Sequence, residues 1–520
     1  MAVAGRLAPV PEESADGSTA AYPPRRHYRD SIRRVAVSGR QIRSTLLLSH
    51  SQSGHSGSSY SSDSGASNSY PSNNSCRSSG SALSAAAAAD WGTHELKTIA
   101  RQMVSDGYTQ RMVQAFEYGG DPDHILENRF LELHIAPPVP AFDGPDRVLE
   151  SWFLELDVDW VLQIRLEHGS QWQLRLRDNS GSSLQDLVER WIRGLTVMVY
   201  SIVELLSVRY EMRSVARFVN AGIDKMLVFV VAIAPAFKAE NLRTVLDMYV
   251  CVRKAMDIME NSQERPELVN LSLLPNLSIH VDILKRAICR MMEKVRTLIE
   301  EDDSWYIEIP RGGGEVHMNT RWIADCIVSL GEADASSIFP TINNSRSIFR
   351  NSSLSDVRDG TIRYVKDLLL RKSELSSDPS MRYLFLLNNS YFVAQMIEPC
   401  EPTHEWKLTA ECKTYMCSYL DVSWGHVMSC LQKSNFRGPL HRWINTSPLS
   451  KFELVFHKTY QTQKFWKVPD PRLRDFLRRM IIIAVISSYR DYLKENPEDV
   501  SRINSTPDIL EAMLGQLFEG

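Results

Sequence analysis

Apolar residues recur at steps of three and four along much of the chain, and this spacing restricts the fold more than any other feature. An α-helix turns once in about 3.6 residues, so residues at these steps share one face that can be buried. The clearest stripes lie in Leu184–Met198, Leu242–Met259, Val281–Ile299 and Ile362–Leu370. Strand-like alternation is scarce, and several prolines fall between helical segments. The sequence therefore predicts an all-α fold of many antiparallel helices.

The predicted helical region is too long for one simple bundle. The chain has 520 residues, of which 43% are hydrophobic, and it shows no strict internal repeat. Bundles stacked end to end are the packing that this length favours. We predict an elongated rod of stacked antiparallel helical bundles. Residues 91–310 would form its N-terminal and middle bundles, and residues 311–520 its C-terminal bundles with a basic surface.

Residues 1–90 differ sharply in composition from the rest. Residues 25–43 are rich in arginine, and nearly half of Ser49–Ser84 is serine, with much glycine and asparagine between. Such a composition buries too little apolar area to offset the entropy of ordering a chain. We predict that residues 1–90 are a disordered Arg-rich and then Ser/Gly-rich segment. It contains no apolar heptads of the kind that form a coiled coil.

The start of the chain and its cysteines indicate a cytoplasmic protein. No apolar stretch typical of a secretory signal follows Met1. The eight cysteines are scattered and form no Cys-x-x-Cys pair, which argues against a disulfide framework or a zinc module. Reduced thiols in the cytosol fit this pattern.

One predicted helix, Pro471–Leu493, combines arginines with an unbroken apolar run. Asp470 is a good N-cap, and proline is favoured at the first helical position that follows it. The run Met480–Ile486 spans about 10 Å as a helix, whereas a bilayer needs about 20 apolar residues. We therefore expect no membrane span here, but a helix apolar on all sides and buried between others.

Basic residues are concentrated around this helix. From Arg437 to Lys494 there are twelve Lys and Arg against four Asp and Glu, although the whole chain carries a net charge of −4. Such an excess fits an anionic surface, where each basic residue contributes about 1 kcal/mol. It also fits a solvated helix face partly paired with Asp470, Asp475 and Asp491.

No motif of an enzyme or metal site is present. The glycines of Arg311–Gly314 follow an extended-looking segment, Tyr306–Ile309, but no Gly-Lys-Ser/Thr ending follows, so we interpret them as a flexible linker. His317, His404 and His441 lack a ligand-type residue at the required spacing, and His426 with Cys430 is only a single pair. We predict a non-enzymatic protein without cofactor or metal.

Several short blocks, in order along residues 94–520, resemble the plant branch of the exocyst seventy-kilodalton subunit family. The Gly-x-Val-His-x-x-Thr-Arg signature of that family is matched at Gly314–Arg321. The other blocks are Leu96–Ala100 with Gly107-Tyr108, Leu384–Asn389 with Tyr391–Val393, Ser423–Gly425, Thr462–Arg474 and Leu517–Gly520.

The resemblance implies a role in the exocyst, which tethers secretory vesicles to the plasma membrane before fusion. Other exocyst subunits would be partners, with small GTPases and immune receptors or effectors as further candidates. The protein would lie in the cytoplasm and peripherally on the plasma membrane and secretory vesicles. The resemblance also implies that the C-terminal bundle binds phosphatidylinositol bisphosphate through basic residues. The candidates for this anionic-lipid site are Arg474, Arg478, Arg479, Arg490, Lys494 and Arg502.

Two departures from the family pattern leave a second hypothesis open. Asp499 and Asn504 stand where the resemblance implies lysine, and only Arg502 keeps the charge of that segment. This predicts weakened lipid binding. The lack of apolar heptads in residues 1–90 points the same way, toward an interaction or adaptor protein outside the complex, for example in plant immunity. Nucleic-acid binding is the least favoured alternative, because no aromatic-basic interleaving typical of a reader is present.

Overall fold

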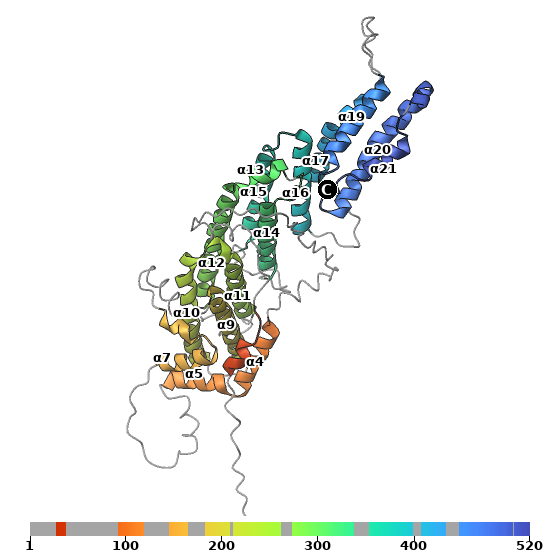
Figure 1. The fold of residues 1–520 in the computed structure, drawn as a ribbon. Coiled ribbons are helices and arrows are strands. Elements are labelled where there is room, and N and C mark those ends of the chain that lie inside the picture. The colour runs from red at the N-terminus through yellow and green to blue at the C-terminus, as the bar shows by residue number, and fades with distance from the viewer. Residues whose placement is uncertain are drawn as a thin grey trace, which may run out of the picture.

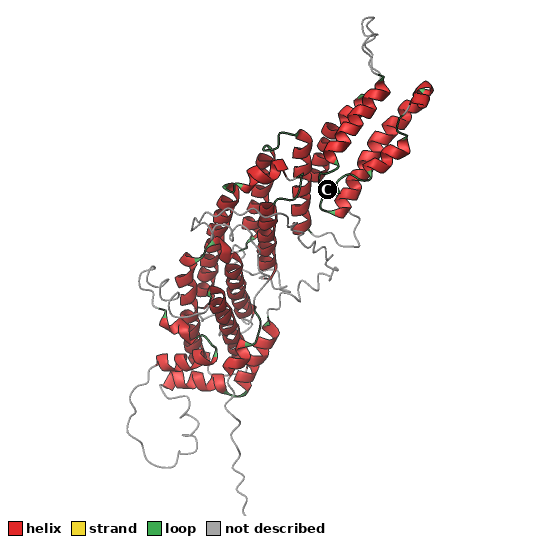
Figure 2. Cartoon of the chain, in the orientation of Figure 1, coloured by secondary structure: helices red, strands yellow, loops and turns green. Residues whose placement is uncertain are grey.

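The computed structural model describes most of the chain beyond residue 91 and one short segment before it. The described residues are 28–37, 92–118, 145–164, 183–207, 212–261, 273–311, 313–336, 353–398, 407–432, 447–502 and 504–519. Within these ranges every regular element is a helix, and an isolated bridge pairs Lys467 with Glu519 (Figure 2). The all-α prediction is confirmed.

The first part of the molecule is a bundle in which long helices surround a buried apolar core. Leu195, Val245 and Leu284, one from each of three predicted stripes, are fully buried in it. The elements are α4 (Thr93–Ser105), α5 (Tyr108–Tyr118), α7 (Pro145–Glu155), η1 (Asp159–Gln163), α9 (Leu184–Ser207), α10 (Met212–Ile233), η2 (Ala234–Ala236), η3 (Ala239–Asn241), α11 (Leu242–Asn261) and α12 (Leu273–Glu300).

Four helices extend this bundle: α13 (Ser304–Arg311), α14 (Met318–Ser336), α15 (Ser355–Ser373) and α16 (Pro379–Ile397). Helix α14 packs on α11, α15 and α16, which joins the new helices to the first ones. The extended conformation expected for Tyr306–Ile309 is wrong, because this segment lies inside α13. Trp305 and Ile309, four residues apart, are buried on one face of α13, while Tyr306 and Ile307 are exposed.

The last part of the chain forms a second group of helices around its own core. Phe452 of one helix and Tyr489 of another stack there, with ring centroids 4.8 Å apart. The elements are α17 (Ala410–Leu420), the π-helical turn η7 (Asp421–Gly425), α18 (His426–Ser429), α19 (Pro448–Gln463), α20 (Pro471–Glu495), η9 (Pro497–Arg502) and α21 (Pro507–Leu514).

The described helices follow one another along one long axis, from α4, α5 and α7 at one end to α19, α20 and α21 at the other (Figure 1). The predicted rod of stacked helices is therefore confirmed. Its buried residues form two clusters, one from Tyr28 to Val393 and one from Met381 to Phe518, and α16 contributes to both. The first cluster continues past residue 310, and the domain boundary at that position stays a prediction.

Helix α20 begins where the sequence predicts it. The Asp470 carboxylate accepts a hydrogen bond from the Leu473 N–H at 2.9 Å, and Pro471 takes the first helical position. The expected burial on all sides is wrong, however. Ile481 and Val485 are fully buried on one face, whereas Ile483 is 60% exposed, because neighbouring helices cover only part of the circumference.

Ordered structure also begins earlier than the sequence predicts. Helix α1 (Tyr28–Arg33) packs on the first bundle, so the prediction of disorder throughout residues 1–90 is wrong for Tyr28–Val37. Ile32 and Val37 are buried there, and this burial offsets the cost of ordering the segment. The serine-rich stretch Ser49–Ser84 lies outside the described residues.

One stretch, Arg213–Ala236, is long and apolar enough to cross a membrane by length and composition alone, and 56% of its most apolar window is buried. It comprises α10 and the η2 turn, and α10 packs against α5, α9 and α12. Phe218, Val230 and Ile233 are buried in this core. The hydrophobicity of α10 is therefore accounted for by its place inside the bundle.

Candidate functional site

The predicted lipid-binding residues Arg474, Arg478, Arg479, Arg490 and Lys494 all lie on α20, at the far end of the rod (Figure 1). They do not form one surface, since a helix turns about 100° per residue. Arg474 and Arg478 share one face and Arg479, Arg490 and Lys494 another. Arg502 ends η9, and its side chain lies outside the described residues.

Arg478 holds the end of the chain. Its side chain is only 14% exposed, and Nε donates to the Leu517 carbonyl at 2.7 Å, with Nη2 directed at the same oxygen. Nη2 also donates to the Glu519 carboxylate at 3.1 Å, and Nη1 lies 3.7 Å from Asp475. These contacts make Arg478 a structural residue that fixes the segment after α21 against α20.

Arg490 and Lys494 are exposed but paired. The Arg490 guanidinium lies 3.4 Å from Asp508 and 3.2 Å from Glu511, both on α21, and Lys494 lies 3.0 Å from Asp491. Exposed pairs of this kind contribute about 0–1 kcal/mol, so an anionic ligand can compete for either cation.

Arg479 and Arg474 differ in how readily they can contact an external anion. Arg479 is exposed and donates only to the Asp475 carbonyl, at 3.3 Å, among the described residues. Arg474 is half-buried, and its Nε lacks a hydrogen-bond partner within the described part of the chain. Arg479 is therefore the candidate best able to meet an external anion.

An exposed stripe on α20 includes two residues absent from the predicted set. Arg472 and Ile483 lie on the same face as Arg479, and both are exposed. The α20 stripe consists of Arg472, Arg479, Ile483, Arg490 and Lys494. Their spacing of seven and four residues is a sequence signal that could have identified the stripe.

The segment before α21 uses its polar residues internally. Asp499, 9% exposed, accepts a hydrogen bond from the Tyr492 hydroxyl at 2.7 Å. Asn504 donates through its backbone N–H and its side-chain amide to Glu453, at 2.9 and 2.6 Å. At both positions where the resemblance implies lysine, the residue present therefore makes hydrogen bonds that hold the segment to α20 or α19.

A second candidate site lies where α16 meets the loop after α13 and the loop before α20. Asn388 of α16 is 2% exposed, and its Nδ2 donates to the carbonyl oxygens of Gly314 at 2.6 Å and Lys467 at 2.9 Å. One buried amide thus joins a loop after α13, the middle of α16 and the loop before α20. Three of the blocks that carry the resemblance meet at this junction.

The neighbouring amide completes the junction. Asn389 is fully buried, donates to the Glu315 carbonyl at 3.1 Å and accepts from the His317 N–H at 3.0 Å. Buried amides must be satisfied by hydrogen bonds, and these bonds fix the backbone of residues 315–317 on α16. The sequence contained this signal as two adjacent asparagines in an apolar helix.

The glycines after α13 form a fixed turn, so the prediction of a flexible linker is wrong for Gly313 and Gly314. Gly314 has φ +91, and a Cβ there would lie 3.0 Å from a Leu384 methyl carbon. Only glycine tolerates both the positive φ and the close approach of Leu384. The Gly313 carbonyl accepts from the Lys467 N–H at 2.8 Å. Gly312 lies outside the described residues.

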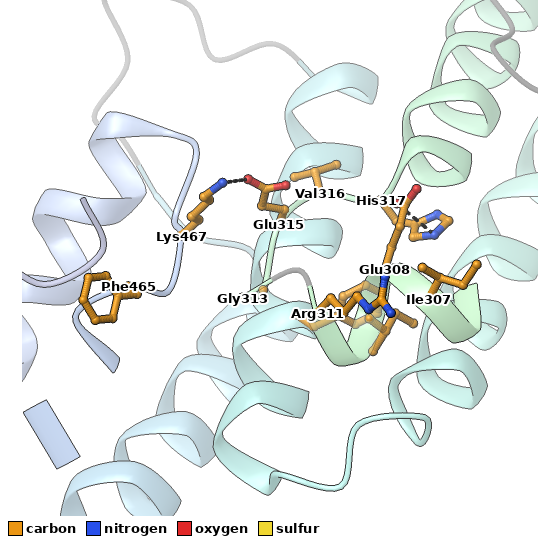
Figure 3. A pocket seen from close by; sticks show the side chains of 12 residues that line it. Ile307, Glu308, Arg311, Gly313, Glu315, Val316, His317, Phe465 and Lys467 are labelled. Carbon is orange, nitrogen blue, oxygen red and sulfur yellow. Dashed lines mark ion pairs between the residues drawn. The ribbon is translucent and has the colours of Figure 1, made fainter. Parts of the chain in front are cut away.

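A cavity of about 370 Å³ opens beside this junction (Figure 3). Its charged lining residues are Glu308, Arg311, Glu315 and Lys467, and the exposed Phe465 borders it. Lys467 and Glu315 pair across the loops at 2.6 Å. The lining holds two acidic and two basic side chains, which does not suit a ligand of strong single-sign charge.

His317 beside this cavity is buried and neutral. Burial lowers the pKa of His317 to about 4, and its ring stacks on Trp305 with centroids 3.7 Å apart. The Asn319 N–H donates to Nδ1 at 3.2 Å, which places the proton on Nε2. Nε2 then donates to Glu308, 3.2 Å away, or Ser304, 3.4 Å away.

This geometry does not activate a nucleophile. The Ser304 hydroxyl donates to the Asp302 carboxylate at 2.6 Å, and a protonated Nε2 cannot accept a proton from it. Serine, histidine and aspartate therefore hold the start of α13 against the turn after it. Among the described residues no group of three or more His, Cys, Asp and Glu side chains could hold a metal ion.

Comparisons with known proteins agree on one family. A family model for the C-terminal part of the Exo70 exocyst complex subunit matches residues 200–516. Exocyst complex component EXO70E2 of Arabidopsis thaliana is 27% identical over 248 residues, 44% of this chain and 37% of the relative. EXO70A3 of the same plant is 23% identical over 341 residues, 59% of this chain and 55% of the relative.

The alignments span between a quarter and just over half of the length of the first three Arabidopsis relatives; the match to EXO70C1 covers 25% of it. Among solved structures, the exocyst component Exo70p of S. cerevisiae aligns with 83% of this chain and 91% of its own. The sequence identity is 15% and the TM-score 0.41.

Proposed function

Because the chain belongs to the Exo70 exocyst complex subunit family, we propose that it is a non-enzymatic subunit that helps tether secretory vesicles to the plasma membrane. The observation that carries the proposal is the family match over residues 200–516, which includes every helix from α10 to α21. Its partners would be other exocyst subunits, and it would work in the cytoplasm, peripherally on these membranes.

The form of the molecule supports this role. A stiff helical rod can hold partners along its sides while one end meets a membrane. The junction cavity contains neither an activated nucleophile nor a metal cluster among the described residues.

We propose that the α20 stripe is the part that meets anionic lipid. Arg472 and Arg479 are exposed, and Ile483 between basic residues offers an apolar side chain to the headgroup region. At about 1 kcal/mol for each basic residue near an anionic leaflet, four such residues give reversible recruitment. Arg478 is not part of this surface, because it binds the chain end.

Vesicle flotation tests the lipid proposal. The full chain should float with vesicles containing phosphatidylinositol bisphosphate and remain behind with neutral phosphatidylcholine vesicles. Arg472→Glu with Arg479→Glu should weaken binding by about tenfold or more, since two attractive charges become repulsive. Raising the salt should reduce binding as well.

A matched variant controls for net charge. Arg286→Glu with Lys294→Glu on α12 changes the charge equally, and both side chains are exposed there. This control should bind the charged vesicles like the natural chain. Equal losses in the two double variants would mean that net charge, not the α20 stripe, governs binding.

The adaptor hypothesis is kept as the second candidate, since Asp499 and Asn504 hydrogen-bond within the protein at positions where lysines would favour lipid. Affinity purification of the full chain from plant cells separates the two. Recovery of other exocyst subunits supports the tethering role. Recovery of other proteins without any exocyst subunit supports the adaptor and contradicts the tether.

A further inference from the structure

The segment Tyr28–Val37 binds the first bundle as a short peptide would. It contains α1 and packs on α4, α7 and α9, and residues 38–91 separate it from the next described residue. Its contacts are those of a ligand, with an apolar face packed into a groove between these helices and polar groups that meet buried partners there.

The polar contacts converge on one buried carboxylate. Asp157 is 1% exposed and accepts hydrogen bonds from Arg29 at 2.8 Å and Arg33 at 2.6 Å, both on the segment. Arg190 of α9 donates to the same carboxylate at 2.9 and 3.1 Å. Burial alone would raise the pKa of Asp157, but these hydrogen bonds outweigh it and lower the pKa.

Two further contacts align the segment in the groove. The Tyr28 hydroxyl donates to Asp106 at 2.7 Å, and the buried Arg193 donates to the Val35 carbonyl at 2.9 Å. Gly92 has φ +64, and a Cβ there would lie 2.2 Å from a Val35 methyl carbon. The groove therefore requires glycine at residue 92 in order to accept the segment.

The segment buries little apolar surface to offset the conformational entropy that it loses on docking. Its buried apolar side chains are Tyr28, Ile32, Val35 and Val37. The free energy gained by burying these side chains is similar in size to the free energy lost by ordering the backbone of ten residues. Docking then depends on the Asp157 contacts and on the covalent tether, which raises the local concentration of the segment.

We propose that Tyr28–Val37 is a reversible intramolecular ligand, and that the groove of α4, α7 and α9 is a docking site for an amphipathic helix with arginines on one edge. The resident segment occupies this site in cis, and a partner helix of the same chemistry must displace it. This surface is distinct from the α20 stripe at the opposite end of the rod, so the inference does not depend on the lipid proposal.

A nicking experiment tests the proposal on the full chain. A protease site is inserted between residues 50 and 80, outside the described structure, and the purified protein is cut there. The N-terminal fragment should remain bound during size-exclusion chromatography. A fluorescent peptide of residues 25–40 should then exchange into the cut protein and raise its anisotropy. Before cutting, the same peptide should bind far more weakly, because the tethered segment occupies the groove.

Peptide variants supply the matched controls and leave the large fragment unchanged. Arg29→Ala with Arg33→Ala should weaken peptide binding by about tenfold or more, since both contact Asp157. Arg34→Ala removes an exposed arginine of the same peptide and should change affinity by less than about twofold. Similar losses for both peptides would overturn the proposed recognition of Asp157.

Other outcomes would also overturn the proposal. A fragment that excess peptide cannot displace is a permanent part of the core, not a ligand. A fragment that leaves at once, with no binding of peptide at about 100 µM, means that the groove has no affinity of its own. Exchange between intact chains to give a dimer would mean that the occupant acts in trans.

Discussion

At the scale of single residues, His317 and Asp157 are both buried, but their surroundings favour opposite charge states. His317 stacks on Trp305 and receives a backbone N–H on Nδ1, so the neutral ring is the stable form. Asp157 receives hydrogen bonds from several guanidinium groups, so the charged carboxylate is the stable form. What distinguishes them is the partner, not the depth of burial.

His317 should make the stability of the fold depend on pH. Its pKa of about 4 in the fold is below the ordinary value of 6.5, so the unfolded chain binds the proton first as pH falls. The neutral ring then stabilises the fold above pH 6.5, and this contribution is lost between pH 6.5 and 4. By pH 5 the loss is about 2 kcal/mol. Urea unfolding at pH 7.5, 6 and 5 measures it.

The control for this prediction is His317→Gln, which cannot titrate in this range. Its unfolding free energy should fall less between pH 7.5 and 5 than that of the natural chain. Parallel pH profiles for the two proteins would show that His317 does not titrate as its surroundings indicate.

Sequence reasoning at this scale succeeded where a residue acts on its own helix. Asp470 and Pro471 were predicted as the start of α20 because capping depends on neighbouring residues only. Gly314 was interpreted as flexible because its constraint comes from Leu384 on a distant helix. Arg478 was predicted to bind lipid because nothing local indicates that Leu517 lies beside it.

At the scale of elements, α20 combines a binding face with a structural face. Its stripe of Arg472, Arg479 and Ile483 faces outward, while Arg478 on another face holds the segment after α21. The predicted set of arginines contained residues of both faces. Helical periodicity predicts which residues share a face, but it does not predict which other part of the chain covers that face.

Replacing Arg478 should loosen the chain end without removing a lipid contact. Lysine lacks the planar pair of donors that reaches the Leu517 carbonyl, so Arg478→Lys should lower the unfolding free energy by about 1–2 kcal/mol. Hydrogen exchange in α21 should become faster. Vesicle binding in the flotation experiment should stay nearly unchanged.

Arg479→Lys is the matched substitution on the exposed face. It should leave the unfolding free energy within about 0.5 kcal/mol of the natural value. If Arg478→Lys reduced vesicle binding while stability stayed constant, Arg478 would have to be returned to the lipid site.

At the scale of the whole molecule, α16 is shared between two cores. Leu386 faces the cluster that reaches back to α1, while Leu387 faces the cluster that reaches Phe518, and both side chains are buried. The all-α rod was predictable, because long amphipathic helices need partners on successive sides. The division of one helix between two cores was not, because α16 is apolar around most of its circumference.

This sharing predicts that two adjacent substitutions affect different parts of the molecule. Leu387→Ala should weaken the C-terminal core and speed hydrogen exchange in α19 and α20. Leu386→Ala should instead speed exchange in α14 and α15. Each substitution leaves a cavity, which should lower the unfolding free energy of the core that contains it by about 2–5 kcal/mol. Mass spectrometry of exchanged peptides reads both regions in one measurement.

Each of the two variants serves as the control for the other. If hydrogen exchange became uniformly faster along the whole rod in both variants, the rod would have a single cooperative core. That result would contradict the division of α16 between two cores.

The Asn388 junction has a mechanical consequence for a rod that is loaded at its ends. Pulling the tip away from the body would load α16, because its buried side chains belong to both cores and its Asn388 amide holds the loops of Gly314 and Lys467. Under tension the contacts between α16 and one of the two cores should therefore give way before the long helices inside either bundle uncoil.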